Sequence, residues 1–114
     1  MLNISIVLYH PRWEEEVVPL VEELLRCRFL RKIYLIDNSE EKSPEVPISS
    51  GKLRYMFMNA NLGYGKAHNI ALRESAYYRT AYHLVLNSDV RVAAEDIDAM
   101  CEWMEGNSSV GLMM

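Results

Sequence analysis

Short apolar runs alternate with stretches of helical periodicity along this chain. The runs are rich in β-branched residues and too short for helices, which predicts buried strands over 4–9, 32–37, 53–58, 82–86 and 110–114. Between them, the spacing of apolar positions predicts amphipathic helices from Val17 onward, over 65–79 and over 94–105. This alternation predicts an α/β fold of three layers, in which a mostly parallel sheet carries helices on both faces.

The same spacing predicts which side of each helix faces the sheet. The first helix has an apolar stripe from Val17 to Leu25, although Pro19 falls in its first turn. In the second helix the residues expected to point inward are Ala67, Ile70, Ala71 and Leu72.

Two segments depart from the alternation. Residues 38–52 contain two prolines, a glycine and clustered Ser and Glu without any period, which indicates a surface connection. The last run, 110–114, has the character of a core strand but no helix follows to cover it. We therefore expect a truncated chain, and self-association through an exposed edge at this C-terminal run.

Composition places the 114 residues in one globular domain, since half of them are apolar and a quarter are charged. The net charge is −4 and the basic residues form no run, which argues against a nucleic-acid partner or an anionic membrane surface. The first apolar run is far too short to span a bilayer, so we expect a cytoplasmic chain. Cys27 and Cys101 match no metal-ligand spacing and are expected to be reduced core thiols.

Polar residues follow each predicted strand, and in open parallel sheets ligands bind outside the carboxyl ends of the strands. These residues are His10, Asp37-Asn38-Ser39, the segment 59–66 and Asn87-Ser88-Asp89. Side chains two apart on an extended backbone share a face, so Asn87 and Asp89 can present an amide and a carboxylate together. That pair suits a divalent cation that keeps several waters and takes substrate phosphates as further ligands. The alternative for Asn-Ser-Asp is an ordinary polar turn.

The glycines of Gly63-Tyr64-Gly65-Lys66 fit neither of two familiar phosphate motifs. A dinucleotide fingerprint would need glycine where His68 stands, and a P-loop would need Ser or Thr where Ala67 stands. Taken alone, the glycines serve a tight helix entry as readily as a ligand.

Four segments together carry a family resemblance: ISIVLYHP, YLIDNS, NANLGYGKAHNIAL and LVLNSDV, in this order. The chain resembles the nucleotide-sugar half of family 2 glycosyltransferases of the GT-A fold, a Rossmann-like half, and within them the rhamnosyltransferase-like branch. The most specific element is N-x-G-x-x-x-A-x-N, met by Asn61, Gly63, Ala67 and Asn69.

The resemblance implies a role for each matching residue. Tyr9 and His10 would flank the base and ribose, and Asp37 would accept a hydrogen bond from a pyrimidine N–H. The residues implied to line the nucleotide pocket are Asn61, Gly63, Lys66, Asn69 and Asn87. Asp89 matches the second acid of a D-x-D metal motif and would bind Mg²⁺ or Mn²⁺. Asn87 replaces the first acid, which weakens the expected metal affinity.

The expected function is therefore that of an enzyme part. Residues 1–114 would bind the donor, a dTDP-rhamnose or a UDP-hexose, for transfer with inversion to a saccharide or lipid-linked acceptor. The general base of the family lies beyond the metal motif, so no catalytic residue is assigned and the chain alone is expected to be inactive. The resemblance also allows the full-length protein to sit peripherally at the inner membrane face. One alternative is a nucleotide-binding module without activity. The other is a flavodoxin-like domain, which would need paired acids or a phosphate loop after the first strand, where this chain has His10-Pro11-Arg12.

Overall fold

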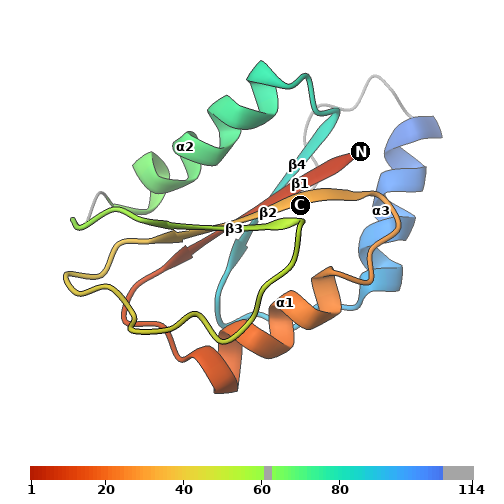
Figure 1. Cartoon of the computed structure of the whole chain (residues 1–114). Helices are drawn as coiled ribbons and strands as arrows, with labels where there is room; N and C mark the ends of the chain where they lie inside the picture. The colour runs from red at the N-terminus through yellow and green to blue at the C-terminus, as the bar shows by residue number, and fades with distance from the viewer. Residues whose placement is uncertain (61–62, 107–114) are drawn as a thin grey trace.

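The structure, a computed structural model, describes residues 1–60 and 63–106. Its strands lie in one parallel sheet in the order β3-β2-β1-β4 (Figure 1). They are β1 (Leu2–Leu8), β2 (Leu30–Asp37), β3 (Leu53–Phe57) and β4 (Tyr82–Asn87). The predicted strands within this part of the chain are thus confirmed, with ends that shift by up to two residues. The predicted strand 110–114 lies outside the described residues.

Helices cover both faces of the sheet, as the sequence predicts. The helical elements are η1 (Trp13–Val17), α1 (Val18–Leu24), α2 (Tyr64–Tyr77) and α3 (Ala94–Gly106). α1 and α3 pack on one face and α2 on the other (Figure 1). The first helix opens with a wide π turn, in which the Val17 N–H donates to the Arg12 carbonyl at 3.2 Å. Pro19 then stands in the first turn of α1, where its missing N–H is no loss.

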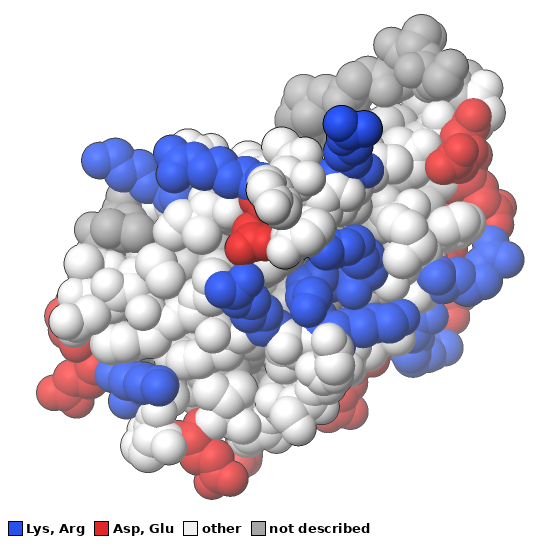
Figure 2. All heavy atoms as spheres, turned by 45° about the horizontal axis from the view of Figure 1, so that its top comes forward, with Lys and Arg blue, Asp and Glu red and all other residues white. Residues whose placement is uncertain are grey.

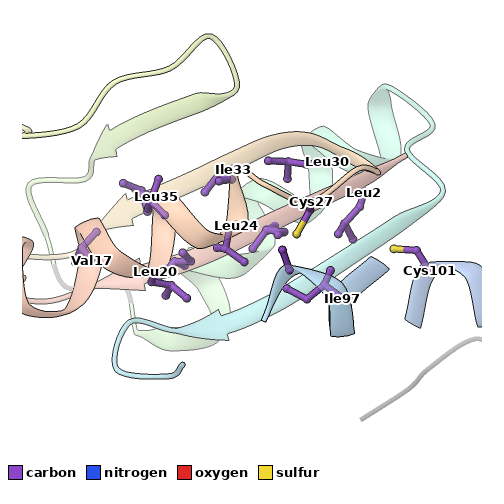
Figure 3. Close-up of a cluster of buried hydrophobic side chains, with 14 of the residues drawn as sticks. Leu2, Val17, Leu20, Leu24, Cys27, Leu30, Ile33, Leu35, Ile97 and Cys101 are labelled. Atoms are coloured by element: carbon purple, nitrogen blue, oxygen red, sulfur yellow. The ribbon is translucent and has the colours of Figure 1, made fainter. Parts of the chain in front are cut away.

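The larger core lies between the sheet and the α1/α3 layer (Figure 3). Ile4, Ile6 and Leu8 of β1 point into it and are fully buried. Val17, Leu20 and Leu24 cover them, and Ile97 and Cys101 of α3 extend the layer. Cys27 and Cys101 are both buried and free, as expected of core thiols. Burial raises the pKa of the Cys27 thiol to about 11, so it stays protonated at neutral pH.

The face under α2 is smaller and more polar. Its apolar contacts come from Tyr34 and Ile36 of the sheet and from Ala67 and Ala71 of the helix. The prediction that Leu72 points inward is wrong, because its side chain is 39% exposed. Positions 67, 71 and 75 form the stripe that meets the sheet, and residue 72 lies about 100° further round the helix.

Side chains under α2 also form a continuous chain of hydrogen bonds. Its members, in spatial order, are Arg31, Asn3, Ser75, His83, Ser5 and His68. The Ser5 Oγ lies 2.8 Å from the His83 Nε2 and 2.7 Å from the His68 Nδ1. A network of this kind, which links the helix to two strands, favours one packing of the helix on the sheet.

Donor chemistry gives this network a direction. The Arg31 guanidinium and the Asn3 amide nitrogen can only donate, so Asn3 Nδ2 donates to Ser75 Oγ at 2.9 Å. The simplest continuation has Ser75 donate to His83 Nδ1, and His83 Nε2–H donate to Ser5 Oγ. Ser5 has one hydroxyl proton, which it then gives to His68 Nδ1. This assignment requires both imidazoles to be neutral.

No helix within residues 1–60 and 63–106 combines the length and the apolar character needed to cross a membrane.

Candidate functional site

Strand order reverses between β1 and β4, and the candidate site lies at that point. The chain leaves β1 through α1 to reach β2 on one side, and after α2 it returns to β4 on the other side. In open parallel sheets the loops part at such a reversal and leave a crevice at the carboxyl ends. A pocket of about 480 Å³ occurs there. It is lined by Val7, Tyr9, Glu16, Asn38, Asn87, Ser88 and Asp89.

Strand register explains why residues distant in sequence meet in this pocket. Val7 pairs with Asn87 of β4 on one side and with Ile36 of β2 on the other. Asn38 continues β2 by one residue, because its N–H donates to the Leu8 carbonyl at 2.8 Å. Since alternate residues share a face, Val7, Asn38 and Asn87 all lie on the α2 side of the sheet. Asp89 does not continue the extended strand, because β4 ends at Asn87 and residues 88–89 form a turn in which the Val90 N–H donates to the Asn87 carbonyl at 3.4 Å. The backbone is therefore that of the polar-turn alternative, although the side chains of Asn87 and Asp89 both line the pocket.

Asn38 also lines the pocket, and the sequence places it at a strand end without predicting a binding role for it. The residue is 2% exposed, and its Nδ2 donates to the Gly63 carbonyl at 3.4 Å. Its Oδ1 is buried and has no hydrogen-bond partner among the described residues. A buried acceptor left without a donor costs about 1–3 kcal/mol, so this oxygen calls for a ligand or water donor. The signal available in the sequence was an amide directly after a buried strand.

Asp37, the predicted base-binding acid, lies on the other face of the sheet. It shares its parity along β2 with Ile33 and Leu35, which belong to the core under α1. Its carboxylate is fully buried and accepts from the Ser39 N–H at 2.9 Å and from the Tyr55 hydroxyl at 2.5 Å. Burial, together with this carboxylate, raises the pKa of Tyr55 to about 12. Recognition of a base by Asp37 stays a prediction. It requires the Tyr55 hydroxyl to give up its hydrogen bond to Asp37 Oδ2, so that this oxygen can accept from the base.

Tyr9 and His10 form an exposed rim above the pocket. The Tyr9 hydroxyl donates to Glu40 Oε1 at 2.8 Å, and His10 Nε2 lies 3.0 Å from Glu40 Oε2. The bond from Tyr9 lowers the pKa of the Glu40 carboxyl. His10 has a φ of 49°, and its N–H is held by Ser39 Oγ at 2.7 Å. A non-glycine residue in this conformation at the end of a central strand is typical of functional loops.

The other predicted nucleotide contacts are placed around the start of α2. Gly63 has φ 80° and ψ 164°, a conformation that is essentially reserved for glycine, and it directly precedes the helix. Lys66 and Asn69 are exposed on α2, and neither lines the described part of the pocket. Asn61 lies outside the described residues. The structure therefore brings together Tyr9, Asn87 and Asp89, and leaves the roles of Gly63, Lys66 and Asn69 as predictions.

The charged groups of the pocket are Glu16 and Asp89, and no Lys or Arg belongs to its described lining. The Glu16 carboxylate is already paired with Arg12, whose Nε lies 4.0 Å from Glu16 Oε1. A phosphate beside Asp89 would be repelled, whereas a divalent cation would offset the charge of that carboxylate. Within the described residues, no group of three or more His, Cys, Asp or Glu could hold a metal by itself. The carboxylate and amide oxygens nevertheless match the chemistry of Mg²⁺ or Mn²⁺ that keeps waters and completes its shell with phosphate oxygens.

In comparisons with known proteins, no family model, no curated protein and no solved structure matches the chain. The glycosyltransferase resemblance therefore stands on the sequence motifs alone.

Proposed function

We propose that residues 1–114 bind the nucleoside diphosphate of a sugar donor, together with a divalent cation, as part of a glycosyltransferase of the GT-A type. The observation that supports this most is the pocket at the strand reversal, because it joins two carboxylates to a buried amide oxygen that has no partner among the described residues. The motif order along the chain supports the same function.

Four of the lining residues then have tasks that fit their chemistry. Asp89 and Glu16 attract the cation, and the cation binds the diphosphate oxygens that the carboxylates alone would repel. Asn38 Oδ1 accepts a hydrogen bond from a hydroxyl of the ribose or the sugar. The exposed ring of Tyr9 offers a surface for the base. Transfer with inversion also needs a general base beside the acceptor hydroxyl, and no residue of this site is assigned that task.

Calorimetric titration with uridine and thymidine diphosphates, and with their sugars, tests the proposal. It is run with and without Mn²⁺ or Mg²⁺ on the parent chain and on Asp89→Asn. We expect saturable binding that needs the metal and falls at least tenfold in Asp89→Asn. Glu22→Gln, an exposed acid of α1 away from the pocket, removes the same charge and should leave binding unchanged. Equal binding by parent and Asp89→Asn would exclude the assigned metal ligand.

Asn87→Asp extends the test in the opposite direction. It restores a second acid in the pocket, and we expect tighter binding in the presence of metal but not in its absence. Improved binding without metal would contradict the role given to the cation. Nucleotide binding by a longer form of the protein that neither transfers nor hydrolyses the sugar would instead favour the alternative of an inactive nucleotide-binding module.

A further inference from the structure

Basic residues that are scattered along the sequence gather on one side of the folded chain. Three come from the first residues of two strands: Arg31 and Lys32 of β2 and Arg54 of β3. The others are Lys66 and Arg73 of α2 and Arg79, which lies just after this helix. Figure 2 shows a field of positive charge on this face that surrounds one acidic spot. The acid of α2 is Glu74, and its carboxylate is already paired with Arg54 at 3.0 Å. We call this surface the α2 face.

A β-bulge at the start of β2 adds to the charge of the α2 face. Leu2 pairs with Leu30 but Asn3 pairs with Lys32, so Arg31 is an extra residue in the strand. Bulges of this kind bend the strand and redirect side chains. Arg31 consequently reaches Asn3 Oδ1 at 3.2 Å and stacks on the Tyr78 ring at 4.7 Å. Two consecutive cations thus stand beside the C-terminal end of α2.

Aromatic and apolar side chains project from the same face into solvent. Tyr77 is 79% exposed, and its ring meets the exposed Tyr78 ring edge-on, with centroids 4.9 Å apart. Leu72 is also exposed, which is the position that the sequence pattern wrongly placed against the sheet. The outer side of α2 therefore combines cations with phenol rings and a leucine. Tyrosine is favoured where an apolar medium meets water, because its ring is apolar and its hydroxyl is polar.

The layer on the other side of the sheet, which contains η1, α1 and α3, is rich in acidic residues. Glu14, Glu15 and Glu16 open η1, and the α3 sequence contributes Glu95, Asp96, Asp98, Glu102 and Glu105. A chain with net charge −4 that is polarised in this way is attracted to a negative surface in one orientation and repelled in the other. The absence of a basic run in the sequence therefore does not exclude an anionic surface as a partner.

We propose that the α2 face docks on an anionic phospholipid bilayer. The two kinds of side chain on this face match the two parts of such a bilayer surface. Arginine and lysine bind lipid phosphates, and tyrosine and leucine enter the headgroup region. The shape of the face separates this partner from a nucleic acid. A helix with projecting Leu72 and Tyr77 fits a planar interface, whereas stacking of nucleic-acid bases needs a groove lined by aromatic rings.

Flotation with lipid vesicles tests the proposal on the whole chain. Vesicles of phosphatidylcholine alone are compared with vesicles that also contain phosphatidylglycerol, at low and at high salt. We expect binding to the anionic vesicles only, and loss of that binding as salt rises. Arg73→Gln/Arg79→Gln, which changes two exposed residues, should weaken partition by roughly thirtyfold, at about fivefold per arginine. Tyr77→Ser should weaken it further without changing the salt dependence.

Arg12→Gln/Lys42→Gln is the matched control, because it removes the same charge from exposed positions away from the α2 face. Equal losses in the two double variants would show a nonspecific charge effect and would overturn the proposal. Equal binding to neutral and anionic vesicles, or no binding to either by the folded parent chain, would also overturn it. Single-stranded RNA is included as a competitor, and displacement of vesicles by RNA at equal phosphate concentration would assign the face to nucleic acid instead.

Discussion

Two histidines under α2, the buried His68 and the half-buried His83, make the stability of this protein depend on pH. Burial lowers the pKa of His83 from 6.5 to about 4, with a smaller contribution from His68, and burial also lowers the pKa of His68 itself. The unfolded chain therefore binds more protons than the folded chain between these values. The stabilisation is complete above about pH 6.5 and is lost as the pH falls toward 4.

The size of the effect follows from the pKa difference. A tenfold change in proton affinity corresponds to about 1.4 kcal/mol, so a pKa of about 4 against 6.5 amounts to about 3 kcal/mol for His83. The structural cause is the directed hydrogen-bond chain. Protonation of His83 adds an N–H at Nδ1, which then opposes the hydroxyl proton that Ser75 donates there at 2.6 Å. Relative to a total stability of about 5–15 kcal/mol, a loss of this size is easily measured.

Urea denaturation between about pH 7 and pH 4.5 measures the effect as a decline in the free energy of unfolding. Carboxylates with lowered pKa values, such as Glu23 and Glu40, lose their contribution only as the pH falls below the ordinary glutamate pKa of 4.5. The decline above that pH therefore belongs to histidines. In His83→Gln we expect a lower stability at pH 7 and a shallower decline, since one of the two titrating groups is gone.

His10→Gln is the control, because His10 is exposed and lies outside the network. It should keep the full decline. The reasoning is refuted if His83→Gln and the parent lose the same free energy over this range, or if the His83 ring titrates near pH 6.5 in NMR spectra of the folded chain.

Three other substitutions test the fold and the strand-end geometry. Ile6→Ala empties a fully buried position and should lower the free energy of unfolding by about 2–5 kcal/mol, so a loss well under 1 kcal/mol in urea would contradict the described core. Gly63→Ala meets no atom within 4 Å, but its backbone conformation should cost roughly 1–3 kcal/mol, and an unchanged Tm would show that the turn can adopt ordinary angles. Tyr55→Phe leaves a buried oxygen of Asp37 without its donor and should cost about 1–3 kcal/mol. If Asp37 recognises a base, the same variant should bind uridine diphosphate more tightly in calorimetry, and unchanged binding would leave Asp37 a structural role.

Secondary structure was largely predictable because its signals are local. The stripe from Val17 to Leu24 is a property of one helix, and the apolar residues of β1 are a property of one strand. The polarity of the layer between α2 and the sheet was harder to predict, although Asn3 and Ser5 alternate with the apolar residues of β1. These side chains need partners, and the partners come from His83 through strand pairing and from His68 and Ser75 through helix packing. That information is long-range, so the position of His83 at the start of a strand does not by itself identify its partners.

The gathering of charge on the α2 face is another long-range property. Arg31 and Arg79 come from different elements of the chain. The bulge in β2 brings Arg31 onto the ring of Tyr78, and Arg79 follows Tyr78 directly in sequence. Counting runs of basic residues detects clusters along the chain, but it does not detect clusters that a parallel sheet assembles from its strands. The fold therefore changes the inference that composition alone allows about anionic partners.

At the candidate site, the sequence locates the strand ends but does not predict which side chains face the pocket. A polar group after a buried strand is readily found, and that rule located both Asn87 with Asp89 and the pair Asp37-Asn38. Which member of an adjacent pair faces the pocket depends on parity, because neighbouring residues on a strand point to opposite faces. The parity of β2 relative to β1 and β4 is set by their pairing, which puts Val7 beside Ile36 and Asn87. Asp37, the charged residue of the pair, is thus held inside the other layer by Tyr55 and Ser39. Asn38 faces the pocket, and its side-chain oxygen has no partner in the part of the chain that the structure describes.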